Sequence, residues 1–315
     1  MTDPAFIRQR HVTDGRDLAY PPLPEALVVP VYDNHTHLDH LDGRVGHWDV
    51  EPLDYREQLD RASSVGVRGV VQVGNDVETS RWSAEMAAIE PRMLAAVALH
   101  PNDAPDYAER GELDDALAVI AELAARPRVR AVGETGLDFY RTEAGPRRDA
   151  QFASFEAHIE IAKQNDIALQ IHDRDAHAAV VATLKRVGAP ERTVFHCFSG
   201  DVELAEICAD NGWYMSFAGN VTFKSAPNLR AALQAAPRHL IMVETDAPFL
   251  TPAPFRGRPN APYLIPHTVR AMAEYLGTDA STLGAQINSN TELVYGRWDS
   301  EPVGPPPSGP IGTIA

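Results

Sequence analysis

Short apolar runs alternate with longer amphipathic stretches along most of the chain. In the longer stretches, apolar residues recur every three or four positions, which is typical of helices that bury one face. We expect the apolar runs to be strands, and they begin near Val31, Val67, Leu94, Val129, Ile167, Thr193, Trp213 and Leu240. Helical stretches between them include Tyr55 to Val65, Leu113 to Ala125, Arg147 to Asn165 and Ala176 to Val187. Eight alternations of this size predict an α/β protein with a (β/α)8 TIM-barrel fold.

The alternating pattern occupies residues 28–298, which is close to the roughly 250 residues of a typical barrel of this kind. A single barrel domain is therefore expected over this range. Residues 1–27 are expected to form a polar N-terminal extension, and the Pro/Gly-rich residues 299–315 a disordered tail.

The few cysteines and the lack of long apolar segments favour a cytoplasmic location. The chain lacks an apolar stretch of membrane-spanning length, and its first residues lack the apolar centre of a secretory signal. Only Cys197 and Cys208 are present, and such sparse usage favours a reducing compartment. We therefore expect a cytoplasmic protein without membrane association or an obligatory protein partner. If the strand before Cys197 is regular, its side chain points away from the side occupied by that of His196.

Histidines and carboxylates end five of the apolar runs. They are His35 and His37 in the first run, and Glu134, His172, His196 and Asp246 in later ones. Residues two apart on a strand point to the same face, so the His35 and His37 imidazoles can approach one ion. The carboxyl ends of all strands meet at one end of a barrel, where active sites of this fold lie. The pattern thus predicts a metallo-dependent hydrolase type of barrel.

The chemistry of this set limits the metals it can hold. Neutral imidazoles with carboxylates suit zinc or manganese, and carboxylates also serve magnesium. Six ligands exceed what a single catalytic ion takes together with its water. The count favours two divalent metal ions that share a carboxylate.

Several sequence motifs resemble those of the TatD family of metal-dependent hydrolases. They are HTHLD at 35–39, GETGLDFY at 133–140, IHDRDA at 171–176, FHCFSG at 195–200, GNVTFK at 219–224 and ETDAPFL at 244–250. The resemblance implies that His35, His37 and Asp246 hold one ion, that His172 and His196 hold the second, and that Glu134 bridges the two. It also implies a TatD-type deoxyribonuclease, because the family includes 3'-to-5' exonucleases on single-stranded DNA.

Three functions remain open at this point. The first is a phosphodiesterase acting on DNA ends, in which a metal-activated water attacks phosphorus and Asp246, with Glu134, forms the catalytic pair. The second is a metal-dependent ester hydrolase such as a D-aminoacyl-tRNA deacylase, since the family also includes relatives that remove D-amino acids from tRNA. The third is a barrel that binds metal without turnover, and the complete ligand set argues against it.

The formal net charge of −16 works against a broad nucleic-acid groove, which would rely on lysine and arginine to neutralise phosphates. Single-stranded DNA ends, or another small phosphodiester or ester, fit this charge better than a long duplex. The candidate substrate-binding residues follow strands or lie in later loops, and are His100, Asn102, Arg174, Lys224, Arg256 and Arg258.

Two carboxylates lie two residues before candidate ligands. Asp33 precedes His35 and Glu244 precedes Asp246, so both are expected to lie deeper on the same face and to orient the ligands. Three aromatic residues, Tyr140, Trp48 and Phe223, are candidates for stacking on a base.

Overall fold

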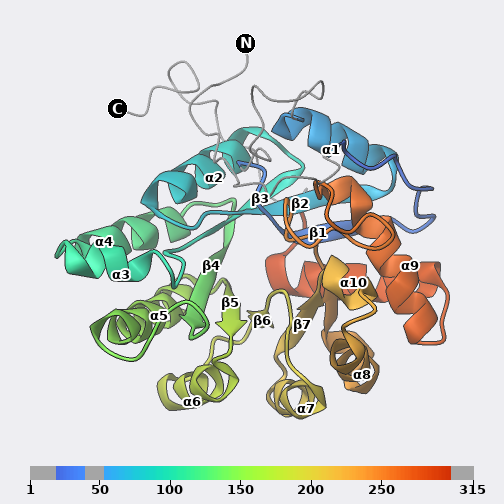
Figure 1. The fold of residues 1–315 in the computed structure, drawn as a ribbon. Coiled ribbons are helices and arrows are strands. Elements are labelled where there is room, and N and C mark those ends of the chain that lie inside the picture. The colour runs from blue at the N-terminus through green and yellow to red at the C-terminus, as the bar shows by residue number, and fades with distance from the viewer. Residues whose placement is uncertain (1–18, 40–52, 299–315) are drawn as a thin grey trace.

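Eight parallel strands form one sheet in the computed structural model, which describes residues 19–39 and 53–298 (Figure 1). The strands are β1 (Val31–Thr36), β2 (Val67–Val73), β3 (Met93–Val97), β4 (Val129–Asp138), β5 (Ala168–Arg174), β6 (Thr193–Phe195), β7 (Tyr214–Phe217) and β8 (Ile241–Val243). Each strand pairs with the next in sequence order, from β1 to β8. All eight begin within one residue of the predicted positions.

Contacts between the first and last strands close the sheet into a barrel. A parallel bridge joins Thr36 to Ala247. The Asp246 amide donates to the His35 carbonyl at 3.0 Å, and the His37 amide donates to the Ala247 carbonyl at 2.9 Å. The prediction of a (β/α)8 barrel is therefore confirmed.

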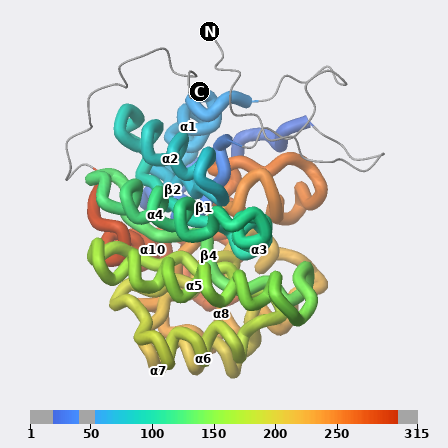
Figure 2. The backbone as a smooth tube through the Cα atoms, turned by 90° about the vertical axis from the view of Figure 1, so that its left-hand side faces the viewer, coloured from blue at the N-terminus to red at the C-terminus, as the bar shows by residue number. Residues whose placement is uncertain are grey.

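Helices surround the strands on the outside of the barrel (Figure 2). The α-helices are α1 (Tyr55–Ser64), α2 (Val77–Ile89), α3 (Ala104–Glu109), α4 (Leu113–Ala124), α5 (Pro146–Asn165), α6 (His177–Val187), α7 (Val202–Asn211), α8 (Pro227–Ala235), α9 (Ile265–Tyr275) and α10 (Ala280–Tyr295). Short 3-10 helices are η1 (Gly219–Thr222), η2 (Arg238–Leu240) and η3 (Pro262–Leu264). The four predicted helices agree with α1, α4, α5 and α6 to within a residue at each end. Among the described residues, no helix is long and apolar enough to cross a lipid bilayer.

Alternating strand residues divide the apolar core into two parts. On β3, Met93, Ala95 and Val97 pack in the larger cluster with residues of the helices. Leu94 and Ala96 belong to a second cluster, which combines residues from most of the strands with Val294, Tyr295 and Trp298 at the end of α10 and after it. Polar side chains, including those of His35, His37 and Glu134, are buried at the carboxyl ends of the strands.

Part of the predicted N-terminal extension packs against the barrel. Leu27 is buried, and its amide donates to the Val65 carbonyl at 3.0 Å. The Tyr263 hydroxyl donates to the Pro21 carbonyl at 2.6 Å. Residues 19–27 are thus an ordered part of the fold, whereas the predictions for residues 1–18 and 299–315 fall outside the described ranges.

A buried histidine in α5 gives the fold an expected pH dependence. The His158 Nδ1–H donates to the Ser154 carbonyl, and Nε2 accepts from the Leu99 amide at 3.1 Å. Burial lowers the pKa of His158 from 6.5 to about 4, so the folded protein holds it neutral where the unfolded chain would protonate it.

This histidine therefore stabilises the fold above pH 6.5, and its contribution falls as the pH drops from 6.5 towards 4. Because of this histidine, the unfolding free energy of the wild type should fall by about 2 kcal/mol when the pH is lowered from 8 to 5. Urea unfolding of the wild type and His158→Gln at both pH values measures this difference. Equal pH dependence in the two proteins would contradict the assignment.

Candidate active site

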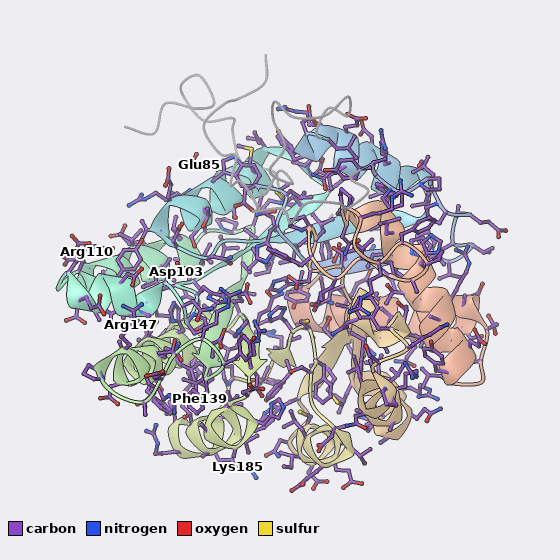
Figure 3. All side chains as sticks on the ribbon, in the orientation of Figure 1. Glu85, Asp103, Arg110, Phe139, Arg147 and Lys185 are labelled. Carbon is purple, nitrogen blue, oxygen red and sulfur yellow. The ribbon has the colours of Figure 1, made fainter. Side chains whose placement is uncertain are left out.

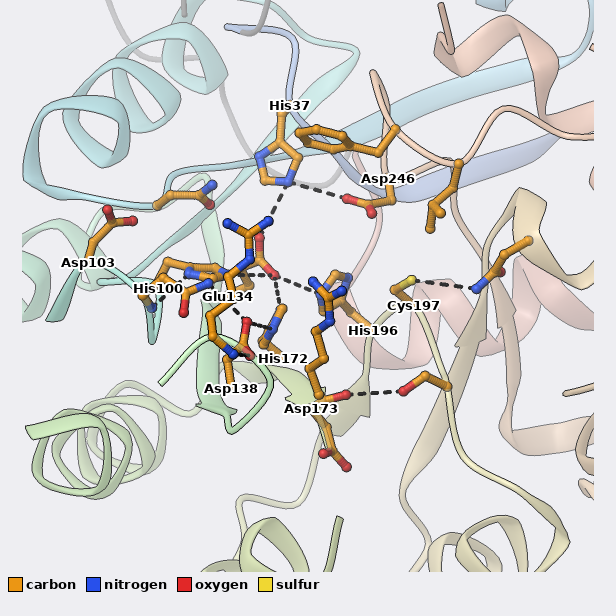
Figure 4. Close-up of a pocket in the computed structure, with 18 residues that line it drawn as sticks. His37, His100, Asp103, Glu134, Asp138, His172, Asp173, His196, Cys197 and Asp246 are labelled. Carbon is orange, nitrogen blue, oxygen red and sulfur yellow. Dashed lines mark hydrogen bonds and ion pairs between the residues drawn. The ribbon is translucent and has the colours of Figure 1, made fainter. Parts of the chain in front are cut away.

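A pocket of about 550 Å³ opens at the carboxyl ends of the strands and contains most of the predicted ligands (Figure 4). His37, Glu134, His172, His196 and Asp246 line it. His35 is fully buried behind them, and its ring stacks on that of His196 with centroids 3.9 Å apart. The barrel therefore brings all six predicted metal ligands together from β1, β4, β5 and the ends of β6 and β8.

Glu134 lies between two groups of histidines. Its Oε1 faces the first group, 3.5 Å from His37 Nε2 and 3.9 Å from His35 Nε2. Its Oε2 faces the second group, 2.7 Å from His196 Nε2 and 3.0 Å from His172 Nδ1. One carboxylate thus presents a different oxygen to each histidine pair.

The first group fits a cation because of the way its histidine tautomers are fixed. His37 Nδ1 lies 3.1 Å from the Val73 carbonyl, which only accepts, so Nδ1 carries the proton. His35 Nδ1 lies 3.1 Å from Gln170 Oε1, and the Gln170 amide nitrogen donates to the Asn34 carbonyl. Both Nε2 atoms therefore present lone pairs to each other at 3.2 Å. A shared cation makes this approach favourable, and Asp246 Oδ1 lies 3.5 Å from His37 Nε2 to complete the set.

The second group contains His172 and His196. His196 Nδ1 lies 3.2 Å from Glu244 Oε1, which fixes the proton on Nδ1 and leaves Nε2 directed at Glu134. His172 Nε2 lies 3.4 Å from Asp138 Oδ2. Imidazole nitrogens and a carboxylate oxygen within this space are a donor set that suits a divalent transition metal.

The charges of the pocket follow from these contacts. Burial opposes ionisation of Glu134, but the facing His196, His100 and His172 hold its pKa well below the usual range. Burial and the neighbouring His196 lower the pKa of His35 well below its ordinary value. Burial also disfavours charge on His196, yet Glu134 and Glu244 raise its pKa well above that of a free histidine. The pocket thus favours an ionised Glu134 at its centre.

The two carboxylates predicted to orient ligands have different partners. Glu244 contacts the His196 ring and also accepts from the Cys197 amide at 2.8 Å. Asp33 instead accepts from the amide of Thr245 at 2.9 Å and from that of His35 at 3.3 Å. Glu244 contacts the side chain of the candidate ligand His196, whereas Asp33 contacts the backbone of His35 and of Thr245.

The sequence interpretation missed two residues that contact the histidines. Gln170 lies two residues before His172 on β5, which is the spacing that drew attention to Glu244 and would have identified it. Asp138 ends β4, four residues after Glu134, and contacts both His172 Nε2 and the Asn102 amide nitrogen. The sequence did not identify Asp138 as a strand-end residue, because the predicted strand ended at Glu134, whereas β4 continues to Asp138.

We expect Gln170 to control metal affinity. Gln170→Leu removes the acceptor of the His35 Nδ1 proton, so the His35 lone pair loses its fixed direction. Metal affinity should fall about 10- to 100-fold, as for other residues that support a ligating histidine. Calorimetric titration of the metal-stripped protein with Mn²⁺ measures the change, and Gln234→Leu on the exposed face of α8 is the matched control. Equal affinity in the wild type and Gln170→Leu would refute the role.

The predicted substrate-binding residues fall into two sets. His100, Asn102 and Arg174 line the pocket, as does Arg141, which the sequence interpretation missed. Lys224, Arg256 and Arg258 are not among the lining residues. The Arg256 guanidinium lies over the Phe223 ring, and Arg258 donates to the Ala19 carbonyl. Arg256 and Arg258, in the loop after β8, therefore contact other parts of the protein. The arginines that line the pocket are Arg141, after β4, and Arg174, at the end of β5.

His100 presents a fixed hydrogen-bond donor to the pocket. Its Nδ1 accepts from the Asn102 amide at 3.0 Å, so the proton lies on Nε2, 3.6 Å from Glu134 Oε2. Burial lowers the pKa of His100 to about 3. In this arrangement the ring is neutral and its Nε2 faces Glu134, and His100, Glu134 and His172 also lie close enough together to hold an ion.

The prediction that Cys197 points away from the site is wrong. Strand β6 ends at Phe195, and Cys197 has a positive φ of 42°. The chain turns at this residue, so strand alternation no longer applies, and Cys197 lines the pocket beside Asn220. Trp48, predicted as a stacking residue, falls outside the described residues.

Comparisons with known proteins identify the family to which this chain is similar. A family model described as TatD related DNase matches residues 32–296. An uncharacterised metal-dependent hydrolase TatD from Mycobacterium tuberculosis is 41% identical over 84% of this chain and 97% of its own length. A 3'-5' ssDNA/RNA exonuclease TatD from Citrobacter rodentium is 33% identical over 77% of this chain and 92% of its own. The crystal structure of YJJV, a TatD homologue from Escherichia coli K12, superimposes with a TM-score of 0.74 at 25% identity, covering 85% of this chain and 98% of that one.

Proposed function

We propose that this chain, which belongs to the TatD family of metal-dependent hydrolases, removes nucleotides from the 3' ends of single-stranded DNA with two divalent metal ions. The position of Glu134 between two histidine pairs carries the proposal, since one carboxylate offers an oxygen to each pair. The name of the Citrobacter rodentium relative supports the choice of single-stranded nucleic acid.

His35, His37 and Asp246 would hold one ion, His172 and His196 the other, and Glu134 both. Bound there, magnesium, manganese or zinc would polarise a phosphate oxygen and acidify a water molecule. The lone pairs fixed by Val73 and Gln170 support the first site, and His196 Nε2, which the contact of Nδ1 with Glu244 directs at Glu134, supports the second.

Asp246 is suited to receive the proton of the attacking water. Its side chain is 14% exposed, whereas that of Glu134 is 6% exposed, so Asp246 is the more accessible of the two carboxylates. A carboxylate in this position acts as a general base when water attacks phosphorus. We assign it this role in addition to metal binding.

His100 and Asn102 are suited to hold the phosphate. The Nε2–H of His100 is directed into the pocket, and burial keeps the ring neutral. The Asn102 amide nitrogen donates to Asp138, which keeps the side chain at the pocket wall. A neutral donor next to Glu134 can bond a phosphate oxygen without attracting the carboxylate into an ion pair.

The test is metal-dependent shortening of a single strand. The purified protein is stripped of metal and mixed with a 5'-labelled oligothymidylate in the presence of magnesium, manganese or zinc. We expect stepwise shortening from the 3' end in at least one metal and none in the stripped protein. A strand with a phosphorothioate as its last 3' linkage serves as the control.

No shortening with any of the three ions would contradict the proposal. Internal cuts in the protected strand would show an endonuclease instead. Hydrolysis of a D-aminoacyl-tRNA ester without cleavage of oligonucleotides would assign the site to the alternative ester chemistry.

A further inference from the structure

We infer that Tyr140, Arg141 and Arg174 form a nucleotide-binding subsite at the rim of the pocket, with Tyr140 stacking on a base and the arginines contacting phosphates. The inference rests on the proposed function and states which side of the pocket the single strand crosses. It assigns that path to the ends of β4 and β5.

Tyr140 is an exposed aromatic side chain directly after β4. It is 65% exposed, and among the described residues it is the only aromatic in the set of large exposed hydrophobic side chains. The Arg174 guanidinium covers one side of its ring at 4.0 Å from the centroid. The other side of the ring is accessible to a flat aromatic base, which can stack on it.

The two arginines leave their guanidinium groups available. In the described part of the chain, neither Arg141 nor Arg174 forms a side-chain hydrogen bond or ion pair with a carboxylate, and both line the pocket. Arg110 and Arg147, labelled in Figure 3, lie in the outer helical layer and form ion pairs with carboxylates. Arg110 pairs with Glu112 and Arg147 with Asp106, each at 2.7 Å.

This difference matters in a chain with a net charge of −16. The pocket wall also carries Asp103 and Asp173, so a phosphate needs local positive charge to approach it. Asp173 is engaged by His177 at 2.7 Å. Arg141 and Arg174, which form no ion pair with a carboxylate among the described residues, supply the required charge, and a planar guanidinium can bind two phosphate oxygens at once.

Backbone hydrogen bonds hold the subsite in a fixed position relative to the candidate ligands. The Arg141 amide donates to Asp138 Oδ1 at 2.9 Å, and the Phe139 amide donates to the Arg174 carbonyl at 2.9 Å. Asp138 also contacts His172 Nε2. The ring and the arginines are therefore attached to the same strand ends that carry Glu134 and His172.

This geometry favours an unpaired strand. A base can lie against the exposed side of Tyr140 only when its own face is free, which a duplex does not allow except at its ends. Stacking of this kind tolerates any base, because every base has a flat aromatic face. The subsite would therefore grip single strands without selecting their sequence.

The experiment compares two substrates in the presence of metal. One is a labelled oligothymidylate, and the other is methyl p-nitrophenyl phosphate, a small diester without a base. Tyr140→Ala should lower kcat/KM for the oligothymidylate about 5- to 150-fold, the range expected for loss of one stacked base. The small diester should be hydrolysed at the wild-type rate, and Tyr140→Phe should retain the oligonucleotide activity.

The arginines are tested by the salt dependence of KM for the oligothymidylate. Arg174→Gln and Arg141→Gln should each weaken the salt dependence. The negative slope of log affinity against log salt should become shallower by about 0.7, since each variant removes one phosphate contact with a single strand. Arg126→Gln makes the same charge change in the loop before β4, at the opposite end of the barrel, and should leave the slope unchanged.

Two results separate this inference from the function on which it rests. Wild-type hydrolysis of the oligothymidylate with no loss in Tyr140→Ala would overturn the subsite alone. Hydrolysis of the small diester but of no oligonucleotide would overturn both the subsite and the nucleic-acid substrate. An equal loss on both substrates in Tyr140→Ala would also overturn the subsite, because it would indicate damage to the pocket.

Discussion

Asp246→Asn will lower kcat for a single-stranded oligonucleotide by about 10²- to 10⁴-fold, the contribution typical of a general base. Asparagine has nearly the same shape as aspartate but cannot receive a proton, and its neutral oxygen is a weaker ligand. The variant should fold normally because the Asp246 amide, which donates to the His35 carbonyl and helps to close the barrel, is retained.

The measurement is single-turnover cleavage of the oligonucleotide at saturating metal. Asp210→Asn, on the exposed surface of α7, is the control for the loss of one negative charge. Activity within a factor of three of the wild type in Asp246→Asn would remove Asp246 from the proposed chemistry. A loss that excess metal fully restores would limit its role to metal binding.

Glu134→Gln will remove most of the stabilisation that metal gives to the wild-type protein. A bound ion present at about 100 times its Kd stabilises the folded state by about 2.7 kcal/mol, which is roughly 5 to 10 °C in Tm for a barrel of this size. Glu134 offers one oxygen to each histidine pair, so its neutralisation weakens both groups together. We expect a Tm shift of at most a few degrees in the variant.

Thermal unfolding of the stripped proteins with and without Mn²⁺ measures both shifts. Glu122→Gln, on the exposed face of α4, makes the same chemical change far from the pocket and should keep the wild-type response. An undiminished shift in Glu134→Gln would show that the metal binds elsewhere or without this carboxylate.

The fold could be predicted from the sequence because each strand and helix carries a local signal. The period of apolar residues indicates the type of element, and parallel pairing of neighbours then places every strand end at one edge. For the same reason, His35 and His37 could be predicted to share a face, and their Nε2 atoms indeed lie 3.2 Å apart. The alternation of side chains along a strand is enough to predict which face a candidate ligand occupies, if that ligand lies within the strand or directly after it.

Residues beyond the strand ends could not be placed in this way. Cys197 follows β6 by two residues and turns into the pocket with a positive φ, a backbone conformation that alternation does not predict. Arg256, predicted as a phosphate contact, lies over the Phe223 ring and is not among the residues that line the pocket. Arg141 lines the pocket because the Asp138 side chain accepts from its amide, and this contact has no signature in residue spacing.

The backbone contact between the ends of β1 and β8 joins residues that are synthesised at very different times. His35 is among the first barrel residues to leave a ribosome and Asp246 is among the last, although the two residues are joined by a backbone hydrogen bond in the finished protein. Glu134, His172 and His196 all precede β8 in the sequence, whereas Asp246, the proposed carboxylate partner of the first histidine pair, follows it. On the proposed ligand set, a chain that terminates before residue 246 is therefore expected to lack hydrolytic activity.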